Sequence, residues 1–110
     1  MRVLLTPRFR SQLKKLRKSY RKVNDDVGEL VSALETGERP GVLLQGVGGL
    51  AVYKVRLANS SAGIGKRGGF RVEYYAGADA ISLFLIWSKS QVDDLPLEVT
   101  LQVLDEEVFD

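Results

Sequence analysis

Apolar residues recur every three or four positions between residues 9 and 34, and this period constrains the fold more than any other feature. They are Phe9, Leu13, Leu16, Tyr20, Val23, Val27, Leu30, Val31 and Leu34. Such spacing puts the side chains on one face of a helix, which a second layer of protein must cover. Because Asn24-Asp25-Asp26 is typical of a helix cap with an acidic first turn, the pattern predicts a helical hairpin broken near Asn24. One long bent helix is the alternative.

The flanking residues predict where this helical segment begins and ends. Residues 3–5 indicate a short first strand, and Thr6 and Pro7 suit the cap and first position of a helix. Gly37 is typical of a helix end. No Lys-Ser/Thr pair follows the glycine-rich residues 41–49, so they are interpreted as a connection with tight turns and not as a phosphate-binding loop.

Alternation of apolar and polar residues predicts strands in the rest of the chain. The side chains expected on the core face are Ala51, Tyr53, Val55, Leu57, Phe70, Val72 and Tyr74. Those expected on the other face are Lys54, Arg56, Arg71, Glu73 and Tyr75. Residues 81–87 are apolar on both faces, as in a central strand covered on both sides.

A final helix is predicted to begin at Pro96, with Leu97, Leu101, Leu104 and Val108 on its buried face. The 110 residues suit one domain, residues 1–110. We expect an α+β fold in which an N-terminal helical hairpin and a C-terminal helix pack on a small, mostly antiparallel four-stranded sheet.

Charge is segregated along the chain, although the formal net charge is only +2. Residues 1–22 contain nine cations and no acids, whereas residues 73–110 contain nine acids and one cation. Between them, no carboxylate occurs in residues 39–72. Blocks of one sign favour a surface that faces a polyanion over a uniformly solvated one.

The strand pattern predicts that cations gather on one face of the sheet. The cluster consists of Lys54, Arg56, Lys66, Arg67, Arg71 and Lys89. Cations without intervening acids suit a phosphate backbone, with a solvated sheet face as the alternative. Tyr75 and Trp87 are candidates for stacking an unpaired base, or else for core packing. Lys14 and Lys18 belong to a second basic stripe, on residues 8–22, which is either a polyanion surface or a solvated helix face.

Two residue types are missing from the sequence and exclude several functions. The chain has no Cys and no His, which excludes a disulfide framework, thiol catalysis, imidazole catalysis and nearly all transition-metal sites. Asp93-Asp94 is interpreted as charge at a helix start, with a hard-metal site as the alternative. No cofactor is expected. The sequence shows no signal-like or membrane-spanning run, so a cytoplasmic protein without membrane contact is expected.

Three segments resemble the RelE/ParE toxin superfamily, most closely its HigB/RelE-like branch. They are Tyr53–Leu57, Gly65–Tyr75 and Trp87–Leu95. The order of elements is similar over nearly the whole chain: short strand, helical hairpin, glycine-rich link, three strands and final helix. The resemblance implies a RelE-like fold and the toxin of a type II toxin–antitoxin pair, with a cognate antitoxin as partner.

The resemblance also implies an activity and its residues. RelE-like members cut messenger RNA on the ribosome without a metal, by attack of the 2′-hydroxyl on the neighbouring phosphate. Lys54, Arg56, Arg71 and Lys89 match the basic residues of that site, and Lys66, Arg67, Tyr75, Lys14 and Lys18 are candidate RNA contacts. Arg56 and Arg71 would stabilise the transition-state charge, and Lys54 would be the base if neighbouring cations favour its neutral form.

The chain departs from the family in one respect that bears on catalysis. Some RelE members use a C-terminal tyrosine, whereas this chain has no Tyr after Tyr75, so the general acid is unassigned, with Lys89 or a ribosomal group as the candidates. Two alternatives remain at this stage: a ParE-like toxin that inhibits DNA gyrase without cleaving nucleic acid, and a degenerate member with only a structural role.

Overall fold

The structure is a computed structural model that describes residues 1–109, and its centre is a five-stranded mixed sheet. The strands are β1 (Arg2–Leu5), β2 (Val42–Leu43), β3 (Val52–Leu57), β4 (Phe70–Ala76) and β5 (Ala80–Ser88). They lie in the order β1-β5-β4-β3-β2. β1 is parallel to β5, and the other neighbours are antiparallel. The predicted α+β class is confirmed.

The sheet has one strand more than the four that the sequence predicted. The additional strand, β2, lies within the segment interpreted as a connection, where Val42 pairs with Lys54 and Leu43 with Tyr53. Both side chains of β2 are at least half exposed. A two-residue strand has no alternation to detect, so its place in the sheet comes from backbone pairing alone.

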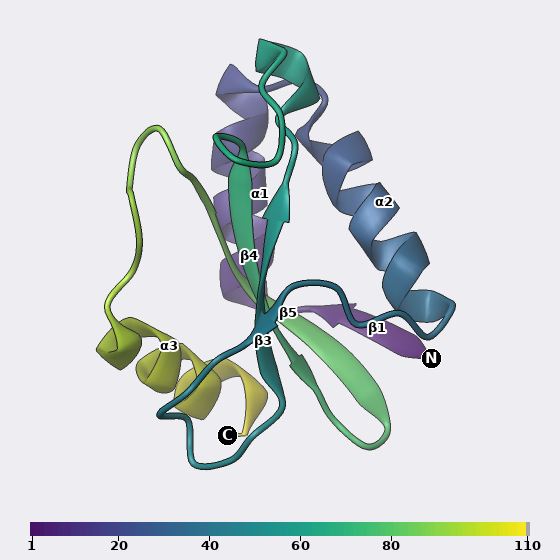
Figure 1. The fold of residues 1–110 in the computed structure, drawn as a ribbon, viewed down its shortest axis with the longest axis vertical. Helices are drawn as coiled ribbons and strands as arrows, with labels where there is room; N and C mark the ends of the chain where they lie inside the picture. The colour runs from purple at the N-terminus through teal and green to yellow at the C-terminus, as the bar shows by residue number, and fades with distance from the viewer. Residues whose placement is uncertain (110) are drawn as a thin grey trace.

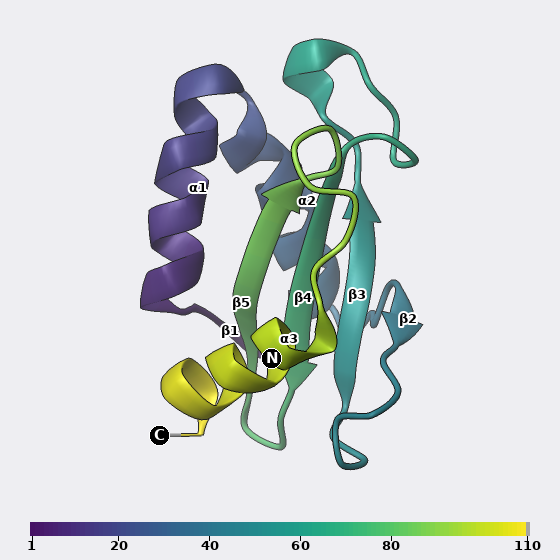
Figure 2. The same cartoon turned by 90° about the vertical axis from the view of Figure 1, so that its left-hand side faces the viewer.

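Two helical layers cover opposite faces of the sheet (Figures 1 and 2). α1 (Pro7–Ser19) and α2 (Val23–Glu35) form a hairpin on one face, and α3 (Leu97–Val103) lies on the other, continued by a π-helical turn over Leu104–Val108. The hairpin is therefore confirmed over the single bent helix. Thr6 caps α1 as predicted, accepting a hydrogen bond from the Phe9 backbone N–H at 3.3 Å. The break falls before Asn24, because Lys22 is the N-cap of α2.

The helical layers give the sheet two hydrophobic cores. The core under the hairpin includes Phe9, Leu16, Val23, Val27, Leu30, Leu34, Val55, Leu57, Phe70, Val72, Tyr74, Ile81, Leu83 and Ile86. The core under α3 includes Val47, Val52, Phe84, Leu85, Trp87, Val103 and Leu104. β5 contributes to both cores, as expected for a strand covered on both sides. A register shift against Glu73 and Tyr74 lets the consecutive residues Phe84 and Leu85 join the same core.

The buried face of the last helix differs from the predicted one. Leu97 and Leu101 are 40% and 42% exposed, whereas Thr100 and Val103 are buried. The Thr100 hydroxyl donates a hydrogen bond of 2.6 Å to the buried Glu73 carboxylate on β4. This polar contact turns Thr100 toward the sheet, and Leu97 and Leu101 face outward, whereas Leu104 is buried in the core under α3 as predicted and Val108 packs against that core.

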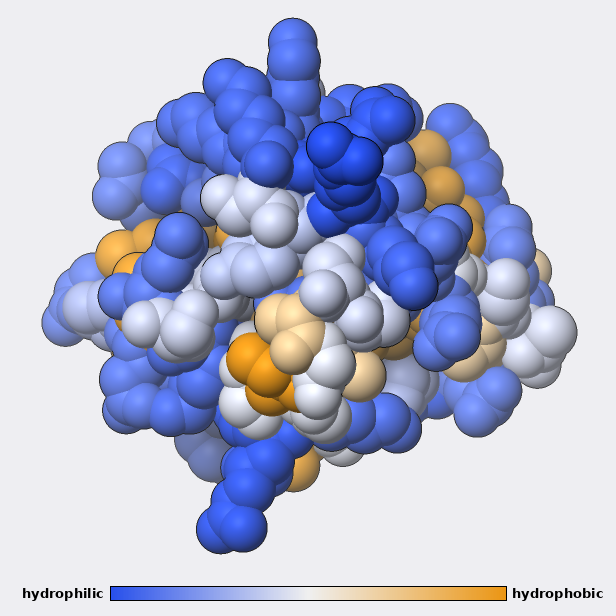
Figure 3. Space-filling model, turned by 90° about the horizontal axis from the view of Figure 1, so that it is seen from above, coloured by the Kyte–Doolittle hydropathy of each residue, from blue (hydrophilic) through white to orange (hydrophobic). Residues whose placement is uncertain are grey.

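The loop between β3 and β4 is fastened to the turn of the helical hairpin at one end of the molecule. The Lys22 N–H donates to Ser61 Oγ at 2.7 Å, and the Ser60 N–H donates to Asp26 Oδ2 at 3.1 Å. Seen from above, this end is mostly hydrophilic, with small apolar patches near the centre and toward the edges of the view (Figure 3). Among the helices of residues 1–109, none has the length and apolar character needed to cross a membrane.

Candidate functional site

A cavity of about 730 Å³ opens on the α3-covered face of the sheet, beside the hydrophobic core of that face. Its walls come from β3, β4, the segment around β2 and the loop after β5. The lining residues are Pro40, Gly41, Val42, Lys54, Val55, Arg56, Lys66, Arg71, Lys89, Asp93 and Asp94. All four of the predicted catalytic residues, and Lys66 of the predicted RNA contacts, therefore lie together. We call this the cation cavity.

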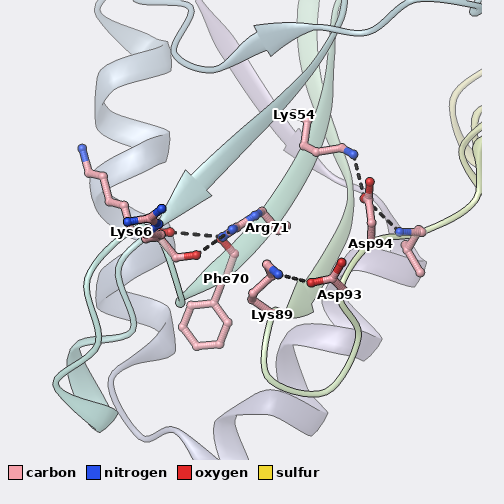
Figure 4. Close-up of polar contacts among 9 residues, drawn as sticks. Lys54, Lys66, Phe70, Arg71, Lys89, Asp93 and Asp94 are labelled. Carbon is pink, nitrogen blue, oxygen red and sulfur yellow. Dashed lines mark hydrogen bonds and ion pairs between the residues drawn. The ribbon is translucent and has the colours of Figure 1, made fainter.

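Lys54 lies on β3 and is held by a carboxylate (Figure 4). Its Nζ is 2.7 Å from Oδ1 of Asp94 and 5.9 Å from the centre of the Trp87 ring. Although partial burial raises the pKa of Asp94, hydrogen bonds from Lys54 and from the Leu95 N–H outweigh it, so the net pKa is lowered. The base role predicted for Lys54 required cationic neighbours, whereas the group in contact with its Nζ is the carboxylate of Asp94.

A second ion pair follows β5. Lys89 Nζ contacts Asp93 Oδ1, four residues further along the chain. Asp93 and Asp94 are therefore bound to the cavity lysines and do not act as charges at a helix start, the role the sequence predicted. The cavity thus combines five cations with two carboxylates, so its cations are partly compensated from outside the acid-free segment 39–72.

Arg71 on β4 is 6% exposed and is committed to the backbone of its own loop. Its Nη1 donates to the carbonyls of Lys66 and Phe70 at 3.1 and 3.3 Å, and its Nη2 donates to the carbonyl of Arg67 at 2.8 Å. Burial lowers the pKa of Arg71, and the charge of Arg56, directly opposite on β3, lowers it further. Arg71 is a positioning residue that fixes the loop carrying Lys66, and it adds its charge to the cavity.

Arg56 and Lys66 are the accessible cations of the cavity. Both side chains are exposed, and within residues 1–109 neither forms an ion pair with a carboxylate. Arg56 belongs to β3 and Lys66 to the loop before β4, so they approach the cavity from different elements. A polyanion reaching the cavity would meet these two side chains without displacing any contact.

The structure does not bring the remaining candidates to the cavity. Arg67 offers its carbonyl to Arg71, but it is not among the lining residues. Tyr75 packs edge-to-face on Phe109, with ring centres 4.9 Å apart, and Trp87 is a core residue, 6% exposed. Lys14 and Lys18 are exposed on α1, which covers the other face of the sheet.

Sequence reasoning did not identify Glu73 as part of the site's surroundings. Glu73 lies opposite Lys54 in the β3–β4 pair and is 1% exposed. Burial raises the pKa of the Glu73 carboxyl, while the hydrogen bond from Thr100 and the charge of Lys54 oppose the increase. A signal existed in the alternation, which put Glu73 on the same face as Arg71, but only the position of α3 shows that this carboxylate is buried.

Gly41 brings the backbone close to Lys54 at the edge of the cavity. Its φ is +99°, and a Cβ at this position would lie 2.4 Å from the Lys54 carbonyl oxygen. Only glycine fits both the left-handed backbone and this close approach. At Gly41 the cavity wall is therefore main chain packed against the backbone of β3.

Neither a protein-family model nor a curated protein matches this chain. Among the described residues 1–109, no group of three or more Asp, Glu, His or Cys side chains lies close enough together to hold a metal ion.

Proposed function

We propose that this protein is the toxin of a type II toxin–antitoxin pair and acts as a metal-independent, ribosome-dependent endoribonuclease on messenger RNA. The observation that supports the proposal best is the cation cavity itself. Lys54, Arg56, Lys66, Arg71 and Lys89 come from two strands and two loops and line one space. Consecutive phosphates of a single strand fit such a set of cations, which binds a backbone without reading its sequence.

In the proposed reaction the cavity stabilises charge on the phosphate. The 2′-hydroxyl loses its proton to water and attacks the adjacent phosphorus, and the bond to the 5′-oxygen of the next nucleotide breaks. That oxygen takes a proton from water, and a 2′,3′-cyclic phosphate remains. Arg56 is accessible and carries a guanidinium fork that suits the extra negative charge of the pentavalent transition state. Lys54 and Lys89, with carboxylates beside them, are assigned to phosphate binding. No side chain is assigned as general acid.

The proposed partners follow from the same surface. The substrate is messenger RNA presented on the ribosome, and the inhibitor is a cognate antitoxin. An acidic segment of the antitoxin laid across Arg56 and Lys66 would block access of a phosphate backbone to the cavity. A cytoplasmic location and toxicity to the cell that makes the protein are part of this proposal.

The test is transcript cleavage in growing cells, followed by primer extension on a defined messenger RNA. We expect the wild-type protein to produce discrete cleavage sites, and R56A to lower cleavage about 100-fold, as for loss of one transition-state donor. R2A is the matched control, because Arg2 is an exposed cation on β1 outside the cavity. Gyrase-dependent DNA breaks with intact transcripts would contradict the proposal and support the gyrase-inhibitor alternative.

A further inference from the structure

Two of the cavity's three lysines are neutralised by one short segment of the same chain. Residues 90–94 follow β5 and are exposed, and this segment supplies both Asp93 to Lys89 and Asp94 to Lys54 (Figure 4). The ammonium groups are partly covered, with side-chain exposures of 32% for Lys89 and 21% for Lys54. Their carboxylate partners are 88% and 59% exposed. The pairs therefore lie at the mouth of the cavity, with the acids on the solvent side.

Ion pairs of this kind are weak enough to be exchanged. Exposed pairs contribute little to stability, because water screens them and two long side chains must be ordered. A ligand phosphate can replace each aspartate on its lysine without leaving a buried charge unpaired. The aspartates would then turn into the solvent that already surrounds them.

Exchange nevertheless discriminates between ligands, because the aspartates are tethered. A tethered group has an effective concentration in the millimolar range, which a free monoanion must exceed to compete. A ligand that is already bound to Arg56 and Lys66 is itself tethered. Its next phosphates therefore compete with the two aspartates for the lysines at a similar effective concentration. Arg56 and Lys66 are the exposed cations without a carboxylate partner in residues 1–109, so they are available for this first contact.

We infer that Asp93 and Asp94 are specificity-determining residues of the cation cavity, which make it accept a strand with several phosphates and reject single phosphate ions. The inference rests on the proposed function, which supplies a single-stranded RNA as the ligand. The aspartates perform this role by occupying Lys54 and Lys89 until a longer polyanion displaces them. Free inorganic phosphate and mononucleotides are thereby kept from occupying the site.

The first measurement is binding of a short 2′-O-methyl RNA, which cannot be cleaved, to the wild-type protein and to D93N/D94N. We expect D93N/D94N to bind roughly two- to fivefold more tightly for each aspartate neutralised, the range that exposed pairs support. The slope of log K against log salt should stay the same, because the bound RNA places phosphates on Lys54 and Lys89 in both proteins. The matched control is D79N/D105N, which removes two exposed acids that do not line the cavity.

The second measurement needs no RNA and uses inorganic phosphate as the probe. Acylation of Lys54 and Lys89 by an amine-reactive ester is followed by peptide mass spectrometry with and without millimolar phosphate. We expect phosphate to protect both lysines in D93N/D94N and to leave their labelling unchanged in the wild-type protein and in D79N/D105N.

The two measurements separate the inference from the proposed function. Equal phosphate protection in wild type and D93N/D94N would overturn the inference, as would an RNA affinity of D93N/D94N no higher than that of D79N/D105N. If RNA binds to none of the proteins while phosphate protects only D93N/D94N, the proposed RNA ligand is wrong and the exclusion of phosphate by the aspartates stands.

Discussion

The face of the sheet under α1 and α2 differs sharply from the face under α3, although the same strands form both. Under the hairpin, β3 and β4 present only apolar and aromatic side chains, such as Val55, Val72 and Tyr74. On the other face the same two strands present Lys54, Arg56 and Arg71, together with the buried carboxylate of Glu73. One face is a continuous core, and the other is half core and half cation cavity.

The position of the charged side chains on one face therefore depends on the packing of the apolar face. Three like charges on adjacent strands repel one another, and a buried arginine and glutamate carry a desolvation cost. The strands hold them in place because their opposite faces are anchored in a close-packed core. Stability should therefore respond most to changes under the hairpin, and binding should respond most to changes in the cavity.

The largest expected loss of stability comes from the hairpin core. F9A removes a fully buried ring between α1 and the sheet and should lower the free energy of unfolding by about 3–5 kcal/mol. L101A, on the outward face of α3, should change it by about 0.5 kcal/mol or less. Urea denaturation of both variants measures the contrast, and equal losses would show that the faces do not differ as described.

An intermediate effect is expected for Arg71, which lies on the cavity face of the sheet but is buried. R71M leaves three backbone carbonyls without their donor and should lower the free energy of unfolding by about 2 kcal/mol. Limited proteolysis of the loop over residues 59–69 should become faster. R67M is the control, because Arg67 contacts Arg71 through its backbone carbonyl, which this substitution keeps. R71K keeps the charge but not the fork, so a loop as protected as in wild type would contradict the positioning role.

The smallest expected change is the pH dependence contributed by Glu73. Because burial raises its folded pKa, the folded state holds this proton more tightly than the unfolded chain does. Stability from this group is thus fully present below the unfolded pKa of about 4.3 and is lost as pH rises toward the folded value. E73Q should match wild type near pH 3 and become the more stable protein as pH increases, measured by urea denaturation across this range. The control for the loss of one acid is E98Q, because Glu98 is exposed on α3.

The stability of D94N should depend on pH in the opposite way to that of E73Q. The lowered pKa of Asp94 gives stability that is present above its unfolded pKa and lost as pH falls. D94N should therefore be slightly less stable than wild type at neutral pH and equal to it in acid. If E73Q and D94N shifted stability in the same direction, the two carboxylates would not differ as their surroundings indicate.

Local patterns predicted the parts of the fold that local physics determines. The alternation in β3 and β4 placed Lys54, Arg56 and Arg71 on one face, because successive side chains of a strand point to opposite sides. The Thr6 cap was also predictable, because the Thr6 hydroxyl and the Phe9 N–H that donates to it are only three residues apart in the chain. The gathering of Lys54, Arg56 and Arg71 in one cavity follows from these strand faces, whereas Lys89 reaches the cavity from the loop after β5.

Contacts between distant parts of the chain were beyond these patterns. Thr100 and Glu73 are 27 residues apart, and their hydrogen bond sets which face of α3 is buried. Lys54 and Asp94 are 40 residues apart, so a local count of charges does not predict their ion pair. Tyr75 was predicted on the correct side of the strand, but Phe109, 34 residues further along the chain, packs on its ring.

The parallel pairing of β1 with β5 has a consequence for how the chain acquires its structure. Arg2 pairs with Ala80 and Leu5 with Leu83, so the first strand finds its partner only after some eighty residues are available. Until then the apolar stripe of α1 has no sheet to pack on, since β5 is also the strand that lies against this helix. Long-range pairing of this kind slows folding and leaves apolar surface uncovered on the way. We therefore expect a fragment that ends before Ala80 to lack the native fold, because both β1 and α1 would be without the strand on which they pack.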